Sequence, residues 1–362
     1  MTEHYHSISI SIQDLFIIIK SNNIEFVDYL NKHFHSISRK SEDPDIVVFL
    51  NWQESIYKNA KPYEFKNLQD LKRIGRRIFI GDNNIVWNEI GEIRGLKLHI
   101  IYNNKVEVRA CYDLNLSKFL AKRFYKQVVR RRSFRRNKED IYEGLTYYLV
   151  YYPILFQLER RYLFPLHASA LTYEGKSILM PGLPGVGKST LCLAFLSYKN
   201  SMFISDNIVL YDDRKIYSFF EPIRLDRTSL GLLPDKGKTL VEMGIESYYG
   251  RHSYRVEDNK IINEIVPEFL IIPCRADENG LIQISSEQAV QLILDFNRIA
   301  GEINSYFTYS SVQNMCLKKE SIDLARVESL YKLVDNLKCY LLFVKSNCPM
   351  EAIIKQIESK IF

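Results

Sequence analysis

The segment over residues 182–189 limits the possible folds and functions of this chain more than any other segment does. It reads Gly-Leu-Pro-Gly-Val-Gly-Lys-Ser and fits the pattern G-x-x-x-x-G-K-[ST] without a gap. Glycines let such a loop turn its main-chain N–H groups inward around a dense anion, and the helix that follows aims its positive end at the same point. In this pattern Lys188 supplies a mobile cation and Ser189 a hydroxyl for Mg²⁺. The segment therefore predicts a site for nucleotide polyphosphate.

The sequence on either side predicts the strand and the helix between which a phosphate loop lies. Residues 177–180 form a short apolar run typical of a strand, and residues 190–196 form an apolar helical segment. A chance match is the alternative, but the chain has only 15 Gly and the flanking pattern fits. The residues that we expect to contact phosphate are Gly182, Leu183, Pro184, Gly185, Val186, Gly187, Lys188, Ser189 and Thr190.

Strands and helices alternate through the second half of the chain, which predicts an α/β fold. Residues 212–214 indicate a hairpin turn, and Ser285 and Gln288 form a capping box for a helix over residues 289–296. Further strands are expected at residues 202–204, 269–272 and 340–344, the last followed by a helix with Pro349 near its start.

The first half has a different pattern, and we find no motif there that indicates chemistry. Residues 12–34 have the pattern of an amphipathic helix, interrupted at residues 21–23, and residues 140–161 indicate another helix. Strands are expected at residues 46–50 and in a hairpin over residues 98–109, whose two turn asparagines tolerate a positive φ.

The length of 362 residues is typical of two domains. We expect an α+β domain of unknown role over residues 1–160 and an α/β domain around the phosphate loop over residues 161–362. No uncharged apolar run reaches the roughly 18 residues that a membrane helix needs. The first residues, Met-Thr-Glu-His, also lack the cationic start of a signal peptide. We therefore expect a cytoplasmic protein with no membrane partner.

The net charge of +6 comes from one stretch of the chain. Residues 118–138 contain ten basic residues and no acidic one, and the remaining residues carry a net charge of −4. We interpret this stretch as a solvated helix and loop between the domains. The alternative is that it docks an acidic partner. We expect no nucleic-acid partner unless the stretch lies near the phosphate loop.

Two polar residues near the loop are candidates for chemistry. Asp206 follows Ser189 by 17 residues and comes just after a predicted strand. An Asp in this place can hold the metal or accept a proton from an attacking hydroxyl. His167 precedes the loop by about 15 residues and would lie on the strand adjoining it. The alternatives are a polar turn at Asp206 and a hydrogen-bonded structural role for His167.

Three segments together resemble the catalytic domain of HPr kinase/phosphorylase and its relatives, which include serine kinases of lasso-peptide gene clusters. The segments are residues 166–169, 182–190 and 204–207, and the resemblance covers roughly residues 160–362. It implies a fold like phosphoenolpyruvate carboxykinase, with a mixed sheet around the phosphate loop. It also implies ATP and Mg²⁺ as cofactors and the ATP-dependent phosphorylation of a serine hydroxyl.

The resemblance implies roles for individual residues. Asp206 matches the first acid of the family's Asp-Asp pair, so it would bind Mg²⁺ and lie close to the base that activates the acceptor hydroxyl. His167 matches the family's histidine upstream of the loop. Arg224 resembles an arginine of a Pro-x-Arg-Leu stretch and would stabilise charge. Glu221 would contact the ligands of the metal ion and not the ion itself. The phosphate-binding residues would be Gly182, Gly185, Gly187 and Lys188, with Ser189 on Mg²⁺.

Two features depart from the family's pattern. Asn207 replaces the second acid of the pair, so metal binding or proton acceptance falls on Asp206 alone. The long glycine-rich signature that follows the catalytic region in the HPr enzymes has no clear copy, which argues against phosphorylase activity and against HPr as the substrate.

We therefore expect a kinase whose acceptor is a peptide, another protein or a hydroxylated metabolite, with oligomer formation left open. One alternative is a nucleotide-binding accessory or regulatory protein with little transfer, which the departure at Asn207 favours. A second alternative is a basic nucleic-acid-binding NTPase.

Overall fold

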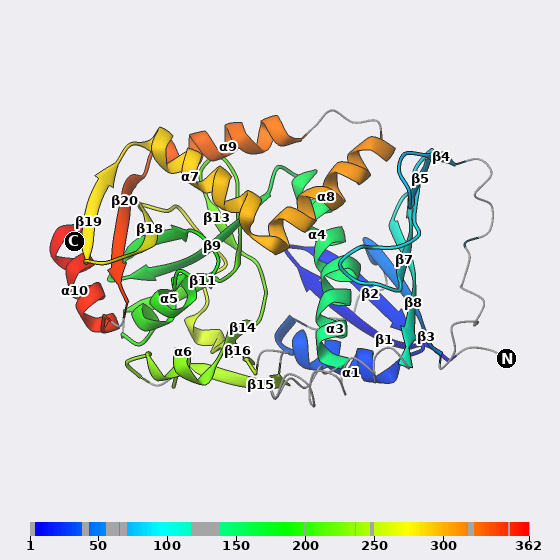
Figure 1. Ribbon diagram of the computed structural model, residues 1–362, viewed down its shortest axis with the longest axis horizontal. Coiled ribbons are helices and arrows are strands. Elements are labelled where there is room, and N and C mark those ends of the chain that lie inside the picture. The colour runs from blue at the N-terminus through cyan, green and yellow to red at the C-terminus, as the bar shows by residue number, and fades with distance from the viewer. Residues whose placement is uncertain are drawn as a thin grey trace. The chain divides into compact units, whose positions relative to one another are not determined.

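Figure 1 shows the chain as a computed structural model, which describes residues 4–37, 43–55, 65, 71–116, 138–198, 200–235, 237–246, 250–317, 322–346 and 348–361. The chain forms two compact units. The first contains Met1–Phe156, Gly244–Gly250 and Tyr309–Glu320, and the second contains Gln157–Met243, Arg251–Thr308 and Ser321–Phe362. Three elements have residues in both units: α4 (Tyr152–Glu159), α8 (Gly301–Cys316) and β15 (Leu240–Glu246).

The first unit is built on one mixed sheet. Its strands lie in the order β1 (His6–Ile12), β2 (Leu15–Ser21), β3 (Ile46–Ser55), β8 (Val106–Asn115), β7 (Leu96–Tyr102), β6 (Asn84–Trp87), β5 (Ile78–Gly81) and β4 (Lys72–Arg73). Strands β2, β3 and β8 are parallel to one another, and the other neighbours are antiparallel. Helices α1 (Ile24–His33) and α3 (Lys138–Thr146) pack with each other, and α1 contacts β1 and β2. A short 3-10 helix (His35–Ile37) and a π-helix (Tyr147–Tyr151) also belong to this unit.

The expected helix over residues 12–34 is wrong in its first half. Residues 6–21 form the β1–β2 hairpin, and in both strands buried side chains alternate with more exposed ones, as they do in strands. The turn residues Gln13 and Asp14 have positive φ values of 49° and 60°, which a two-residue hairpin turn of type I′ requires. The expected interruption is confirmed, since α1 begins at Ile24 and the side chain of Asn23 accepts the amide of Phe26.

The other expectations for the first unit are largely confirmed. Residues 46–50 lie in β3, and β7 and β8 form the hairpin over residues 98–109. Its turn has three residues between Tyr102 and Val106, and neither Asn103 nor Asn104 has a positive φ, so that detail is wrong. A loop of three residues is not the two-residue type I′ turn, which needs positive φ at both of its central residues. The helix expected over residues 140–161 is present as α3, the π-helix and α4.

The second unit is built on a larger mixed sheet. Its strands lie in the order β17 (Glu264–Ile265), β13 (Ile216–Ser218), β12 (Ile208–Tyr211), β9 (Phe164–Tyr173), β10 (Lys176–Pro181), β18 (Phe269–Ala276), β20 (Lys338–Lys345) and β19 (Gly280–Ile284), and β11 (Ser201–Ser205) also pairs with β9. Strands β10, β18 and β20 run parallel, so their carboxyl ends meet at one edge. Strand β9 is antiparallel to β10, β11 and β12.

Helices cover both faces of this sheet (Figure 1). One hydrophobic cluster joins α5 (Lys188–Leu196) and α10 (Met350–Ile361) to the strands, and another joins α7 (Ser286–Ile299) and α9 (Asp323–Asp335) to the opposite face. A small sheet in the order β14 (Ile223–Leu225), β16 (His252–Val256) and β15 carries α6 (Arg227–Gly231), and a 3-10 helix spans Asp258–Lys260. The unit is therefore mixed α/β, as the alternating pattern predicts.

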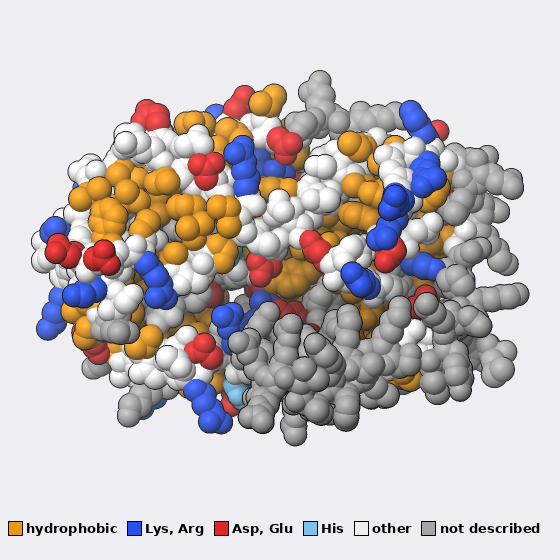
Figure 2. Space-filling view, viewed as in Figure 1, with side chains coloured by type: hydrophobic (Ala, Val, Ile, Leu, Met, Phe, Trp, Pro, Cys, Tyr) orange, Lys and Arg blue, Asp and Glu red, His pale blue; other side chains and the backbone are white. Residues whose placement is uncertain are grey.

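The individual elements expected in the second half are confirmed. Strands β10, β11, β18 and β20, the β12–β13 hairpin and helices α5, α7 and α10 all lie where the pattern places them. Helix α7 has the capping box between Ser285 and Gln288. Within the described part of the chain, no helix is both long and apolar enough to cross a bilayer. Figure 2 shows hydrophobic side chains on the surface in the region that β19, β20 and α7 occupy in Figure 1, and Ile282 and Ile299 are exposed side chains of β19 and α7.

Candidate phosphate-binding site

The loop between β10 and α5 has the backbone that its glycines predict. Strand β10 ends at Pro181, and α5 begins at Lys188 with Gly187 at its N-cap. Gly185 and Gly187 have φ values of +78° and +100°, a region that residues with a side chain rarely adopt. A Cβ atom added at either position would meet nothing within 4 Å, so backbone conformation and not space requires glycine there.

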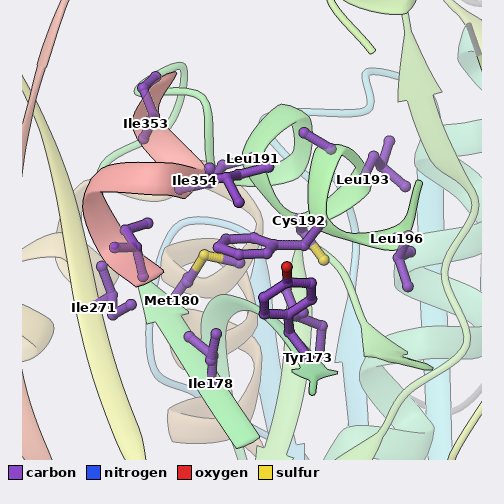
Figure 3. Packing of buried hydrophobic residues seen from close by; sticks show 14 of the residues in the cluster. Tyr173, Ile178, Met180, Leu191, Cys192, Leu193, Leu196, Ile271, Ile353 and Ile354 are labelled. Carbon is purple, nitrogen blue, oxygen red and sulfur yellow. The ribbon is translucent and has the colours of Figure 1, made fainter. Parts of the chain in front are cut away.

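Hydrophobic packing holds the two ends of the loop in place. In Figure 3, side chains of β10 and α5 point into one cluster together with side chains of α10, among them Met180, Leu191 and Ile354. Each of these three is at most 3% exposed. A helix start and a strand end that are fixed in this way fix the direction of the loop amides between them.

The ammonium group of Lys188 is buried and fully hydrogen-bonded. Its Nζ donates to the main-chain oxygens of Gly182 and Leu183 and to Nε2 of His167, each at 2.9 Å. An ammonium has three donors, so these acceptors use all of them. Burial lowers the pKa of Lys188 to about 8, against the opposite effect of the nearby Asp206 and Glu302 carboxylates.

His167 lies on β9, the strand beside β10, as the sequence predicts. Its main-chain N–H donates to the side-chain oxygen of Asn297 on α7 at 3.1 Å. Burial, and then the adjacent Lys188 charge, lower the pKa of His167 to about 3. The ring is therefore neutral near pH 7, and because Nε2 accepts from Lys188, the ring proton is on Nδ1.

Asp206 lies between β11 and β12 and faces the start of α5. Its carboxylate accepts a hydrogen bond from the hydroxyl of Ser169 on β9, and it lies close enough to Ser189 of the loop for that residue to affect its pKa. Burial raises the pKa of Asp206, while the two hydroxyls, Lys188 and the amide of Asn207 act in the opposite direction. The structure thus brings Lys188, Ser189, Asp206 and His167 together.

The donors at this point fit a magnesium ion. Mg²⁺ prefers oxygen ligands and is commonly held by one or two protein groups together with substrate phosphates. The Asp206 carboxylate and the Ser189 hydroxyl converge beside the loop and are such groups. Among the described residues there is no group of three or more His, Cys, Asp or Glu side chains arranged to hold a metal ion. A metal here would therefore depend on nucleotide phosphates for further ligands.

Asn207, Glu221 and Arg224 form a chain of contacts next to Asp206. Asn207 has a φ of +68° and donates its side-chain amide to Oε2 of Glu221 at 2.9 Å. Arg224 of β14 donates to Oε1 of the same carboxylate at 3.1 Å. The Glu221 side chain is fully buried, so the Asn207 amide and the Arg224 cation satisfy a carboxylate that would otherwise be costly to bury.

A cavity of about 520 Å³ opens over the loop. The loop itself, with β18 and β20, forms one part of its lining, and β14, α6 and Arg251, the residue before β16, form another. Its cationic lining side chains are Lys188, Arg224, Arg251, Arg275 and Lys345, and its acidic one is Asp226. Such a cavity favours a polyanion.

Three of these cations were not anticipated from the sequence: Arg251, Arg275 and Lys345. Arg275 and Lys345 lie at the carboxyl ends of β18 and β20, and these strands run parallel to β10, so both residues reach the edge where the loop lies. The only indication of Arg275 and Lys345 in the sequence is that a basic residue lies near the end of each of these two predicted strands. The stretch over residues 118–138 lies outside the described residues except for Lys138, so the acidic partner expected there stays a prediction.

Chains of solved structures match this protein. The chain is similar to a solved structure described as the Hpr(Ser) kinase/phosphatase from Coxiella burnetii, at 9% sequence identity and a TM-score of 0.26, over 54% of this chain and 94% of that one. No protein-family model and no curated protein matches the chain.

Proposed function

We propose that this chain is an ATP-dependent kinase that transfers the γ-phosphoryl group to a hydroxyl. The acceptor is a serine of a peptide or protein, or a hydroxylated metabolite. We also propose that the second unit has the phosphoenolpyruvate-carboxykinase-like fold of the HPr-kinase type. The observation that carries the proposal is that the Asp206 carboxylate lies close to Ser189 and to the Lys188 cation at a phosphate loop. A hydroxyl, a carboxylate and a cation around such a loop are the groups that phosphoryl transfer uses.

The loop amides and Lys188 bind the nucleotide. The triphosphate competes with the two main-chain oxygens and the His167 ring for the ammonium group, and its charge makes it the stronger acceptor. His167 is then a positioning residue, since it holds Lys188 at the loop while no phosphate is bound. Arg224, fixed by Glu221 at 3.1 Å, adds positive charge on the facing part of the cavity lining.

Asp206 has two tasks in this proposal. With Ser189 it would hold Mg²⁺, which neutralises charge on the phosphate oxygens when bound. It would also accept the acceptor's proton. In the transfer step the hydroxyl oxygen bonds to the γ-phosphorus, the bond from that phosphorus to the β–γ bridging oxygen breaks, and ADP leaves with the electron pair. The hydroxyl proton passes to the Asp206 carboxylate.

The test is a transfer assay on the full chain. Purified protein is incubated with γ-labelled ATP, Mg²⁺ and an array of serine-containing peptides, in parallel with a Lys188→Ala variant. We expect label on peptide serine with the wild-type chain, and its loss with EDTA and in the variant. Absence of ATP binding in the wild-type chain would overturn the proposal.

The second candidate is a nucleotide-binding regulatory protein with little transfer. Asn207 favours it, because the second acid next to Asp206 is replaced by an amide bound to Glu221. In the same assay this function predicts ATP binding by the wild-type chain, with neither labelled peptide nor hydrolysis of ATP.

A further inference from the structure

Arg275 reaches the phosphate loop from a neighbouring strand. It lies near the carboxyl end of β18, which pairs in parallel with β10, the strand that leads into the loop. Its Nη2 donates to the main-chain oxygen of Gly185 at 3.3 Å, and the side chain also lines the cavity over the loop. The residue is exposed, so solvent and a ligand in the cavity can both reach the guanidinium.

The other cavity arginines have acidic neighbours. Arg224 is bound to Glu221 at 3.1 Å. The pKa of the Asp226 carboxyl is lowered mainly by the hydrogen bond from the Ser229 backbone, and the charge of the nearby Arg251 adds to this. Over the described part of the chain, no carboxylate forms an ion pair with Arg275, and its contact is a long hydrogen bond to a neutral carbonyl. Phosphate oxygens accept charge-assisted and often bidentate hydrogen bonds, so they bind a guanidinium more strongly than this carbonyl does.

Resting on the function proposed above, we propose that Arg275 is a further catalytic residue, whose guanidinium leaves the Gly185 carbonyl and binds oxygens of the transferring γ-phosphoryl group. Lys188 approaches the phosphates from within the loop, whereas Arg275 approaches from the β18 side. Negative charge on the transferring group and the bridging oxygen is redistributed as the bond to ADP breaks. An arginine of the same chain stabilises that charge in the transition state and so raises the rate of transfer.

The role can be measured without knowing the acceptor, because water can replace it. In that reaction a water oxygen bonds to the γ-phosphorus, the bond to the β–γ bridging oxygen breaks, and ADP leaves with the electron pair. The water proton passes to Asp206, as the proton of an acceptor hydroxyl does, and the products are ADP and inorganic phosphate. The full chain is assayed for Mg²⁺-dependent ATP hydrolysis under single-turnover conditions, with nucleotide affinity measured separately by calorimetry with a non-hydrolysable ATP analogue.

We expect Arg275→Ala to lower the hydrolysis rate by about a hundredfold or more while changing nucleotide affinity by less than about fivefold. Arg275→Lys should keep the nucleotide affinity and recover only part of the hydrolysis rate, because a point charge lacks the planar fork of donors. Arg298→Ala removes an exposed arginine of α7 whose contact is an ion pair with Asp295, and serves as the matched control with wild-type rates.

The outcomes separate this inference from the function on which it rests. A wild-type chain that hydrolyses ATP together with an Arg275→Ala variant of equal rate overturns the role of Arg275 and leaves the kinase intact. A variant that loses affinity and rate in equal proportion also overturns it, because the arginine then only binds nucleotide. A wild-type chain that binds ATP but neither hydrolyses nor transfers it overturns the kinase itself, and the role of Arg275 with it.

Discussion

The ammonium group of Lys188 lies 2.9 Å from Nε2 of His167, and both residues are buried in the second unit. Burial lowers the pKa of both side chains, to about 8 for Lys188 and about 3 for His167. Near pH 7 the pair is therefore a charged donor and a neutral acceptor. This arrangement keeps a cation ready at the loop without a second positive charge beside it.

The first prediction concerns the pH dependence of nucleotide binding. Phosphate favours the charged form of Lys188, so its pKa rises when nucleotide binds. Above pH 8 the free protein has lost the proton and must take it up again on binding. We expect the association constant for ATP to fall about tenfold per pH unit above pH 8, measured by calorimetry. A Lys188→Met variant should bind weakly with little of this dependence, and an unchanged slope would count against the assignment.

The second prediction concerns acid stability. The pKa of His167 is about 3 in the folded chain, against 6.5 for an ordinary histidine. Between these values the unfolded chain binds more protons, so the free energy of unfolding decreases as pH falls through this window. A His167→Asn variant should show a shallower decrease between pH 6.5 and pH 3 in urea titrations. Parallel curves for the variant and the wild-type chain would contradict the burial of a neutral imidazole.

The third prediction separates backbone strain from space at the loop. Gly187→Ala places a side chain at a φ of +100°, which we expect to cost about 1–2 kcal/mol of stability and to weaken ATP binding. Gly182→Ala is the matched control, because its added Cβ would be 3.5 Å from its nearest neighbours and its φ is not positive. Chemical denaturation and calorimetry report the two effects. Equal losses for both variants would show that the left-handed backbone is not the cause.

The fourth prediction tests the contact between Asn207 and Glu221. Asn207→Asp removes a donor at 2.9 Å from a buried carboxylate and sets a second carboxylate beside it. We expect a loss of about 1–3 kcal/mol at pH 8, smaller at pH 5, where one proton can be shared between the two acids. Asn200→Asp is the control, since its amide makes a similar contact with Glu174 at 3.0 Å on the exposed surface. A loss of equal size at both sites would contradict the role of burial.

The parts of the fold and of the site that could be predicted are those that depend on contiguous sequence. The loop, β10 and α5 follow from a contiguous pattern, and the position of His167 on the adjoining strand follows from its distance to the loop. The first hairpin could not be separated from a helix, because its short isoleucine-rich segments fit either period until Gln13 and Asp14 are known to turn. The position of Arg275 at the phosphate loop could not be predicted, because it depends on β18 lying next to β10 and parallel to it.

The central claim is that the Asp206 carboxylate beside the loop activates the attacking hydroxyl while the loop binds the nucleotide. Asp206→Asn keeps the size and shape of the side chain that meets Ser169 and Ser189. The most direct measurement is therefore the single-turnover rate of γ-phosphoryl loss from bound ATP in this variant, together with its affinity for ATP. The account predicts affinity within about threefold of wild type and a rate lower by about a hundredfold or more. A variant that transfers or hydrolyses at the wild-type rate would contradict it.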